Sequence, residues 1–305
     1  YDRFVNQGAV MGDSFGLENV LWFANNKEDA HEEPTIKRSR SHDYVSREVI
    51  NVRENVGLIE VANFSKHEFK GTDARKFLDH VMAGKLPKPG RISLSPMLSY
   101  RGKLCGDLTV ACFDENEFMV FGSGAAQEMH RRWFESHLDK FDVNYKNRSD
   151  EFHGISIAGP NSRKVLEKIV RDDVSNEKFK FRDSRRMFVG GVPAIVNRIS
   201  FTGELGYEIY VAPHYQIKLY EELMEAGKEF NIKPFGGRAL MSMRLEKNWG
   251  AWTLDYRPDF TAKETGLDMF INWDKDFIGK EKAKSENSSN KLTPLIVETN
   301  DIDVT

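Results

Sequence analysis

The stretch ISFTGELGYEIYV, Ile199 to Val211, places two carboxylates in a glycine-hinged turn between two runs that alternate like β-strands. Gly203 and Gly206 flank the turn and allow the backbone to take positive φ there. Glu208 follows at the start of the second run. A carboxylate held there offers two acceptor oxygens in one plane, the shape that holds parallel N–H donors such as those of an aminopyrimidine or pterin ring. An ordinary hairpin with solvent-facing glutamates is an equally open interpretation.

The composition is that of a globular protein. Of the 305 residues, 40% are hydrophobic and 30% charged, and the net charge of −3 gives no general attraction to nucleic acid. No apolar run approaches the ~20 residues of a membrane span, and the charged N-terminus does not resemble a signal peptide. Cys105 and Cys112 are an odd number of residues apart in a strand-like run, so neither a disulfide nor a metal pair is expected. Reduced thiols without an export signal predict the cytoplasm or an organelle matrix.

Helical and strand patterns alternate irregularly along the chain. Their order predicts an α+β fold with antiparallel sheets rather than the regular βαβ alternation of a doubly wound fold. The expected strands are 56–62, 93–100, 102–113, 117–122, 142–147, 153–158, 187–199 and 206–212. The expected helices are 73–82, 125–138, 161–169, 215–229 and about 237–247.

Several common motifs of catalysis and cofactor binding are missing from the sequence. GlySerGly at 122–124 lacks the third glycine and the downstream acid of a dinucleotide-binding fingerprint, so flavin or nicotinamide binding is not expected within this chain. No P-loop, HExxH, GxSxG or paired CxxC occurs. His130 and His137 lie two helical turns apart, too far to share a metal without other ligands, so no metal site is predicted.

Polar residues within apolar strands remain as candidates for chemistry. Asp107 lies in LCGDLTV, where a strand disfavours a charge unless something offsets its desolvation. Such an acid could stabilise a cationic intermediate or take up a proton, and the alternative is an exposed strand acid beside Gly106.

A basic residue and a group of aromatic residues extend this set. Arg238 opens a helix after PFGG, where its guanidinium could bind a ligand carboxylate in a bidentate manner. The alternative for Arg238 is a surface ion pair with Glu204, Glu208 or Glu246. Trp249, Trp252 and Tyr256 could wall a planar heterocycle, and they could equally fill a core.

Seven segments, in order from about Arg47 to Val297, resemble the folate-dependent aminomethyltransferase superfamily, which includes the T-protein of the glycine cleavage system. The segments are VRENVGLIE (52–60), SPMLSYRGKLCGDLTV (95–110), AGPNSR (158–163), TGELGYE (202–208), MRLEK (243–247), FTAKETGL (260–267) and DFIGKE (276–281). Within that superfamily the chain is most similar to the C-terminal, tetrahydrofolate-binding half of dimethylglycine and sarcosine dehydrogenases. That similarity depends on GAVMGDSFGLE…LWF (8–23), SFTGELGYE (200–208) and RLEK…WGAW (244–252).

The resemblance implies three parts in the chain. Residues 1–48 would be an N-terminal extension as in those dehydrogenases, and residues 49–284 the folate-binding region, built as two interleaved subdomains. Residues 285–305 would be a linker and the first strand of a C-terminal β-barrel domain that is largely missing. The cofactor implied is tetrahydrofolate, with FAD only in a separate or missing N-terminal domain.

The resemblance also implies roles for single residues. Glu208 would hold the pterin ring, Asp107 would lie near the transferring carbon, and Arg238 would pair with the glutamate tail of folate. Tyr100 lies beside the family's ligand-contacting positions, and Phe201, Glu204 and Trp252 are further candidates for the cofactor site. The family often has Tyr where this chain has Phe201, so one hydroxyl contact is absent.

The implied activity is transfer of a methylene or aminomethyl unit from a dimethylglycine- or sarcosine-like amine to tetrahydrofolate, giving methylene-tetrahydrofolate. Its partners would be folate, a small N-methyl amine and a fused or separate flavoprotein half, with neither nucleic acid nor membrane. Two alternatives stay open: a demethylase that produces methyl-tetrahydrofolate, and a non-catalytic folate-binding module. The second is disfavoured because the chain lacks the KGCYxGQE-type motif of such modules and retains Asp107.

Overall fold

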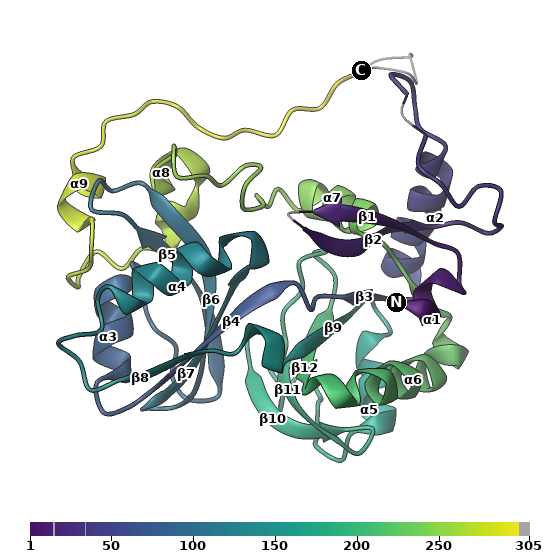
Figure 1. The fold of residues 1–305 in the computed structure, drawn as a ribbon, viewed down its shortest axis with the longest axis horizontal. Coiled ribbons are helices and arrows are strands. Elements are labelled where there is room, and N and C mark those ends of the chain that lie inside the picture. The colour runs from purple at the N-terminus through teal and green to yellow at the C-terminus, as the bar shows by residue number, and fades with distance from the viewer. Residues whose placement is uncertain (15, 34, 299–305) are drawn as a thin grey trace.

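The computed structural model describes residues 1–14, 16–33 and 35–298. Two sheets form the body of the molecule: a six-stranded sheet ordered β10-β11-β12-β9-β3-β13 and a five-stranded sheet ordered β5-β6-β7-β4-β8 (Figure 1). All strand pairs within them are antiparallel except β13 with β3. The predicted α+β class with antiparallel sheets is therefore confirmed.

The five-stranded sheet contains the predicted meander. Its strands are β5 (Arg91–Leu98), β6 (Leu104–Asp114), β7 (Glu117–Ser123), β4 (Phe64–Lys70) and β8 (Asn144–Asn147). Helices α3 (Ala74–Val81) and α4 (Gln127–Glu135) pack on one face, where Phe77, Leu78 and Phe134 join an apolar cluster with the strands. Residues on the other face of β6, including Asp107, are left to meet the second sheet.

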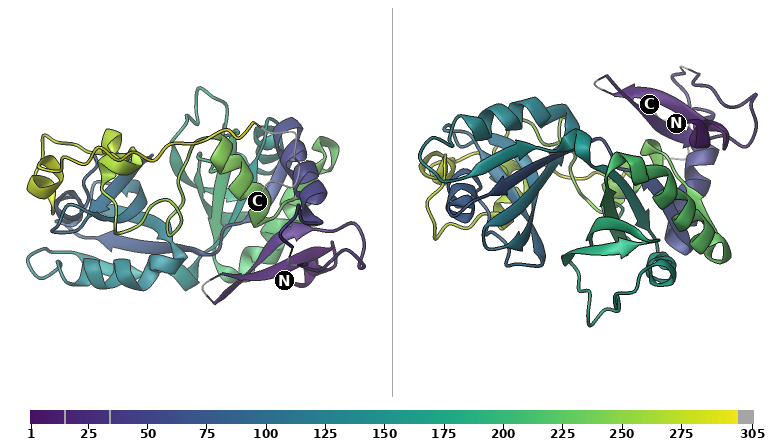
Figure 2. Two further views of the ribbon diagram at one scale, coloured as in Figure 1. Left: turned by 90° about the horizontal axis from the view of Figure 1, so that it is seen from above. Right: turned by 60° about the horizontal axis from the view of Figure 1, so that its bottom comes forward.

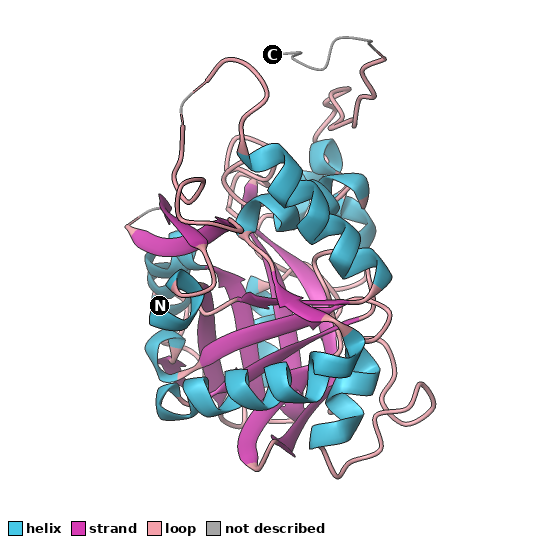
Figure 3. Cartoon of the chain, turned by 90° about the vertical axis from the view of Figure 1, so that its right-hand side faces the viewer, coloured by secondary structure: helices cyan, strands magenta, loops and turns pink. Residues whose placement is uncertain are grey.

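The six-stranded sheet has helices on its outer face. Its strands are β10 (Ser184–Val189), β11 (Val192–Asn197), β12 (Gly206–Val211), β9 (His153–Ala158), β3 (Val56–Glu60) and β13 (Ile232–Pro234). Helices α5 (Ser162–Ile169) and α6 (Gln216–Gly227) bury Val165, Leu166, Leu219 and Leu223 against it. Figure 3 shows that helices also lie mainly on the outside in the rest of the molecule, with the strands of the two large sheets between them.

The inner faces of the two sheets meet through a third apolar cluster, which includes Ile92, Met119, Ile195 and residues of α7 (Gly237–Glu246). Phe121 of β7 stacks on Tyr210 of β12, with ring centroids 4.7 Å apart, so one aromatic pair joins the sheets directly. This junction fixes how strands β6 and β12 face each other.

Two strand predictions were wrong in detail. The run 187–199 is a hairpin, β10 and β11, turned by Gly190 and Gly191, both at positive φ. Residues 198–205, expected to begin with a strand, form an irregular loop instead. Gly203 takes φ +88° as anticipated, whereas Gly206 lies within β12 and has no positive φ.

The N-terminal segment packs on the six-stranded half beside α7 (Figure 2). It contains α1 (Asp2–Val5), the hairpin of β1 (Ala9–Ser14) and β2 (Leu17–Phe23), and α2 (Ser41–Glu54). Helix α2 continues across the predicted boundary between residues 48 and 49.

The C-terminal segment follows the short helices α8 (Ala262–Thr265) and α9 (Lys280–Lys284). Residues 286–298 contain neither helix nor strand and cross the molecule from α9 toward α2 (Figures 1 and 2). The strand expected within residues 285–305 is thus not formed within the described residues, and the rest of that prediction, residues 299–305, lies outside them.

Glu48 of α2 connects strand β2 of the N-terminal hairpin with the residue that precedes helix α7. Its carboxyl oxygens accept the backbone N–H groups of Phe23 (2.7 Å) and Gly236 (2.8 Å). Desolvation raises the pKa of Glu48 to about 7. We expect Glu48→Ala to lower the free energy of unfolding by about 2–4 kcal/mol in urea titrations, because the N–H groups of Phe23 (part-buried) and Gly236 (buried) lose their acceptors.

Glu54→Ala, an exposed site on the same helix, is the matched control for this substitution. A raised carboxyl pKa means that the folded state favours the protonated form, so the stabilisation from Glu48 is complete at low pH and declines as the pH rises through about 7. The difference in free energy of unfolding between wild type and Glu48→Ala should therefore become smaller as the pH rises through about 7. If Glu48→Ala and Glu54→Ala lost the same free energy of unfolding at every pH, this account of Glu48 would be contradicted.

Candidate functional site

A cavity of about 690 Å³ lies where the two sheets meet. Its volume is in the range of small-molecule sites. Its walls are mainly apolar and aromatic, with contributions from Ile92, Phe121, Phe181, Phe201, Trp249 and Trp252. Asp107 and Glu208 both line this cavity, one from each sheet.

Asp107 projects from β6 toward the cavity, opposite Pro96 of β5. Strand alternation gives Thr109 the same orientation, and Thr109 lines the cavity too. Within residues 1–14, 16–33 and 35–298, the Asp107 carboxyl makes no side-chain hydrogen bond or ion pair. Desolvation by the surrounding walls raises the pKa of Asp107 to about 7. An acid of this kind can exchange a proton near neutral pH.

Glu208 projects from β12, between Asn197 of β11 and Ser156 of β9. Its Oε2 accepts a hydrogen bond from the Tyr210 hydroxyl at 2.8 Å, while no protein donor within the described residues reaches Oε1. Desolvation raises the pKa of Glu208 to about 7, against smaller lowering effects of Tyr210 and the Lys247 charge. One oxygen is thus fixed by the protein, and the other faces the cavity without a partner.

Tyr210 holds the Glu208 carboxyl in place. Residues 208 and 210 lie on one face of β12, and the buried Tyr210 ring is clamped by its stack on Phe121. The hydroxyl therefore has little freedom, and neither has the carboxyl oxygen that it donates to. A preorganised acceptor binds a ligand with less loss of conformational freedom than a mobile one.

Three further predicted residues also line the cavity: Phe201, Glu204 and Trp252. Glu204 accepts a hydrogen bond from Arg53 at 2.8 Å, so its charge is already paired. Phe201 and Trp252 offer ring faces and edges, which suits a flat heterocycle.

Tyr100 and Arg238 lie outside the cavity. The Tyr100 side chain is 66% exposed and its hydroxyl is 2.7 Å from Nε2 of His137. Arg238 forms an ion pair with Glu32 and donates to Ser41, and not to any of the three glutamates considered from the sequence. Helix α7 contributes Leu240 and Met241 to the cavity. Ligand contacts of Tyr100 and Arg238 remain predictions from the resemblance.

Comparison with known proteins identifies the family. Residues 1–275 match the GCVT N-terminal domain. The chain belongs to this family.

Named relatives agree with this assignment. The chain is 36% identical to mouse dimethylglycine dehydrogenase, mitochondrial, over 96% of its own length and 34% of the relative's. It is 30% identical to an aminomethyltransferase of Thermoanaerobacter pseudethanolicus, over 79% of this chain and 67% of that one. The predicted aminomethyltransferase-type enzyme is confirmed at the level of the family.

The chain spans about a third of the length of the dimethylglycine dehydrogenases that it matches. In three dimensions, the Bartonella henselae glycine cleavage system aminomethyltransferase T superposes with a TM-score of 0.79, covering 93% of this chain and 72% of that one. At 20% identity this likeness shows a shared fold.

Three residues at or next to the cavity were not predicted from the sequence: Tyr210, Asn197 and Lys247. Tyr210 could have been found, because its spacing of two from Glu208 on a strand puts both on one face. Asn197 faces Glu208 across β11 and β12; its Oδ1 accepts the Ser184 hydroxyl at 2.7 Å, and its buried Nδ2 has no partner within the described chain. Lys247 follows α7 and lines the cavity, a placement that only the tertiary fold reveals.

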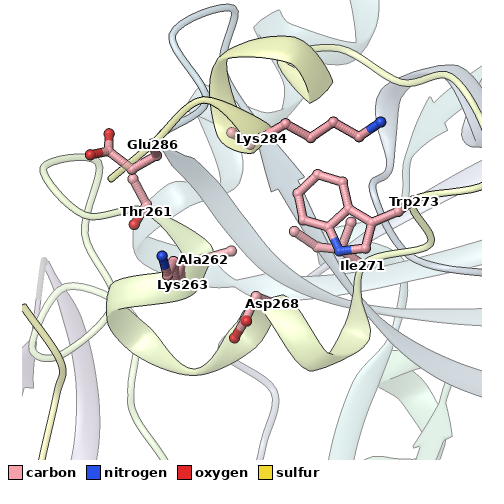
Figure 4. A pocket seen from close by; sticks show the side chains of 9 residues that line it. Thr261, Ala262, Lys263, Asp268, Ile271, Trp273, Lys284 and Glu286 are labelled. Carbon is pink, nitrogen blue, oxygen red and sulfur yellow. The ribbon is translucent and has the colours of Figure 1, made fainter. Parts of the chain in front are cut away.

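A second, smaller hollow of about 260 Å³ lies between α8 and α9 (Figure 4). Lys263, Asp268 and Lys284 line it together with Trp273. It contains none of the residues predicted from the sequence for the site. Elsewhere in the described chain, no group of three His, Cys, Asp or Glu side chains could hold a metal ion, and no helix is long and apolar enough to cross a membrane.

Proposed function

We propose that this GCVT domain transfers a one-carbon unit from an N-methyl amine of the dimethylglycine or sarcosine type to tetrahydrofolate, giving methylene-tetrahydrofolate. The observation that carries the proposal is the convergence of Asp107 and Glu208 on one aromatic-walled cavity from two different sheets. The resemblance of the surrounding motifs to folate-dependent enzymes gives these two acids their roles.

The residues present fit a reduced folate. The cavity of about 690 Å³ is large enough for a drug-sized ligand, and its walls suit a flat ring. Oε1 of Glu208 lacks a protein partner and would accept the N–H donors of a pterin. When bound, tetrahydrofolate would supply the nucleophilic nitrogens that receive the carbon.

Asp107 would assist the transfer by electrostatics and proton exchange. Two new bonds join the methylene carbon of the iminium donor to folate nitrogens, and the bond from that carbon to the donor nitrogen breaks. The two folate N–H protons leave with the amine as an ammonium ion, so atoms and charge balance. Asp107, with a pKa of about 7, would stabilise the cationic donor and carry a proton between the two nitrogens.

The partners of the domain follow from the same proposal. Formation of an iminium requires two-electron oxidation of the amine, which we assign to a flavoprotein half, either fused or separate, that carries FAD. Mouse and human relatives named dimethylglycine dehydrogenase, mitochondrial, support this partner and favour the organelle matrix as the compartment.

Product identification tests the proposal. We expect the protein, supplied with tetrahydrofolate and with dimethylglycine oxidised in situ by a flavin amine oxidase, to yield methylene-tetrahydrofolate by mass spectrometry. Formaldehyde dehydrogenase in the mixture removes formaldehyde released by hydrolysis and so suppresses the uncatalysed product. A yield independent of the protein would overturn the proposal, and methyl-tetrahydrofolate formed from a sulfonium or quaternary amine would indicate the demethylase instead.

A further inference from the structure

Two cationic side chains line the cavity within the described residues, Arg182 and Lys247, and the charge of Lys247 acts on Glu208. Lys247 follows the last turn of α7, and its Nζ donates to the backbone oxygen of Ser200 at 3.1 Å. Its ammonium lies 5.2 Å from the centroid of the Trp249 ring. Its stem passes 3.6–3.7 Å from where a Cβ on Gly203 would be, so the positive-φ turn packs against the lysine. The ammonium is therefore held at the cavity wall although the residue is solvent-accessible.

The charge of Lys247 is not neutralised by a direct partner. Across residues 1–14, 16–33 and 35–298, no carboxylate forms an ion pair with it, and one backbone acceptor leaves two of its three N–H donors unused. Surrounding walls lower the pKa of Lys247 by desolvation, while the nearby Glu208 charge acts in the opposite direction. The two groups influence each other without touching.

An acceptor and a donor thus stand apart on the same cavity: Oε1 of Glu208 and the ammonium of Lys247. Neighbouring N–H and C=O groups on a six-membered ring diverge by about 60°, so partners that each hydrogen-bond one of them are about 5 Å apart. Within the described residues Glu208 and Lys247 line the same cavity without forming an ion pair, so a ring can stand between them and meet both. A ring with adjacent N–H and C=O groups matches this pair.

We propose that Glu208 and Lys247 together read the lactam edge of a 4-oxopterin, Glu208 accepting from the ring N–H and Lys247 donating to the 4-oxygen. This inference rests on the proposed function and goes beyond it by making Lys247 the determinant of which pteridines bind. In a 4-aminopteridine the same position carries an N–H₂ donor, which meets an ammonium donor and finds no acceptor. The site therefore selects 4-oxo over 4-amino ligands.

Titration calorimetry with two ligands tests this selection: tetrahydrofolate and its 4-amino analogue. We expect wild type to bind the 4-oxo ligand at least tenfold more tightly, because a donor facing a donor leaves both unpaired. Lys247→Met should lower the ratio of the two affinities several-fold without removing it, because a 4-aminopteridine also lacks the ring N–H that Glu208 accepts. Lys247→Arg should keep the preference by retaining a cationic donor. Lys263→Met, on the rim of the smaller hollow, is the control and should leave the ratio at the wild-type value.

The outcomes separate this inference from the function on which it rests. Absence of binding of either ligand to wild type overturns the proposed function and this inference with it. If wild type binds tetrahydrofolate and its 4-amino analogue with equal affinity, the proposed role of Lys247 is overturned and the proposed function is not. The behaviour of the variants does not change that conclusion. An unchanged ratio in a Lys247→Met protein that unfolds at the wild-type temperature also overturns it.

Discussion

Glu208→Ala is expected to abolish measurable folate binding. The substitution removes the acceptor of two charge-assisted hydrogen bonds from the pterin, worth together about 3–5 kcal/mol, or about two to three and a half orders of magnitude in Kd. It also leaves the Tyr210 hydroxyl without its partner. Calorimetry with tetrahydrofolate measures the loss directly.

Two controls distinguish binding from folding in this experiment. Glu208→Gln keeps the shape and one acceptor but loses the charge, so it should bind with intermediate affinity. Glu225→Ala, an exposed ion-pair site on α6, should bind as wild type does. Because the pKa of Glu208 is about 7, wild-type affinity should rise as the pH increases through neutrality and the carboxylate ionises. Unchanged affinity in Glu208→Ala would refute this placement of the pterin.

The sheets were accessible to sequence reasoning because their strands have one face in a core. Leu108, Val110 and Cys112 alternate with residues of the opposite face, and this pattern predicted the meander that carries Asp107. The loop 198–205 has a similar pattern and was misread. There Ser200 and Thr202 hydroxyls bond each other at 2.7 Å, and Thr202 also accepts the backbone N–H of Glu204 at 3.2 Å. These local bonds compete with a strand ladder.

The site was only half accessible from the sequence, for a different reason. Asp107 and Glu208 could be recognised because each is an acid within an apolar strand, where a charge requires an explanation. Arg238 opens α7 and Lys247 follows its end, and the sequence cannot say which end turns toward the cavity. The fold decides it: the loop 200–204 packs against Lys247, whereas Arg238 pairs with Glu32 in the N-terminal segment.

Asp107→Asn separates chemistry from binding. The variant keeps the size of the side chain and the cavity, so tetrahydrofolate should bind within a fewfold of the wild-type affinity. Loss of the proton acceptor and of the negative charge should reduce the rate of methylene-tetrahydrofolate formation by about 10²–10⁴-fold. Rapid-quench measurement of the product with saturating folate isolates this step from binding.

The pH dependence gives the same prediction a second, independent readout. Desolvation raises the pKa of Asp107 to about 7, and the ionised form is the one that accepts a proton and stabilises a cation. The wild-type rate should therefore increase with pH through about 7 and level off above it, whereas Asp107→Asn should be slow and lack this inflection. Thr109→Val, a change at a neighbouring cavity residue on the same face of β6, should retain the inflection. If Asp107→Asn kept both the wild-type rate and the inflection near pH 7, the proton transfer would belong to another group.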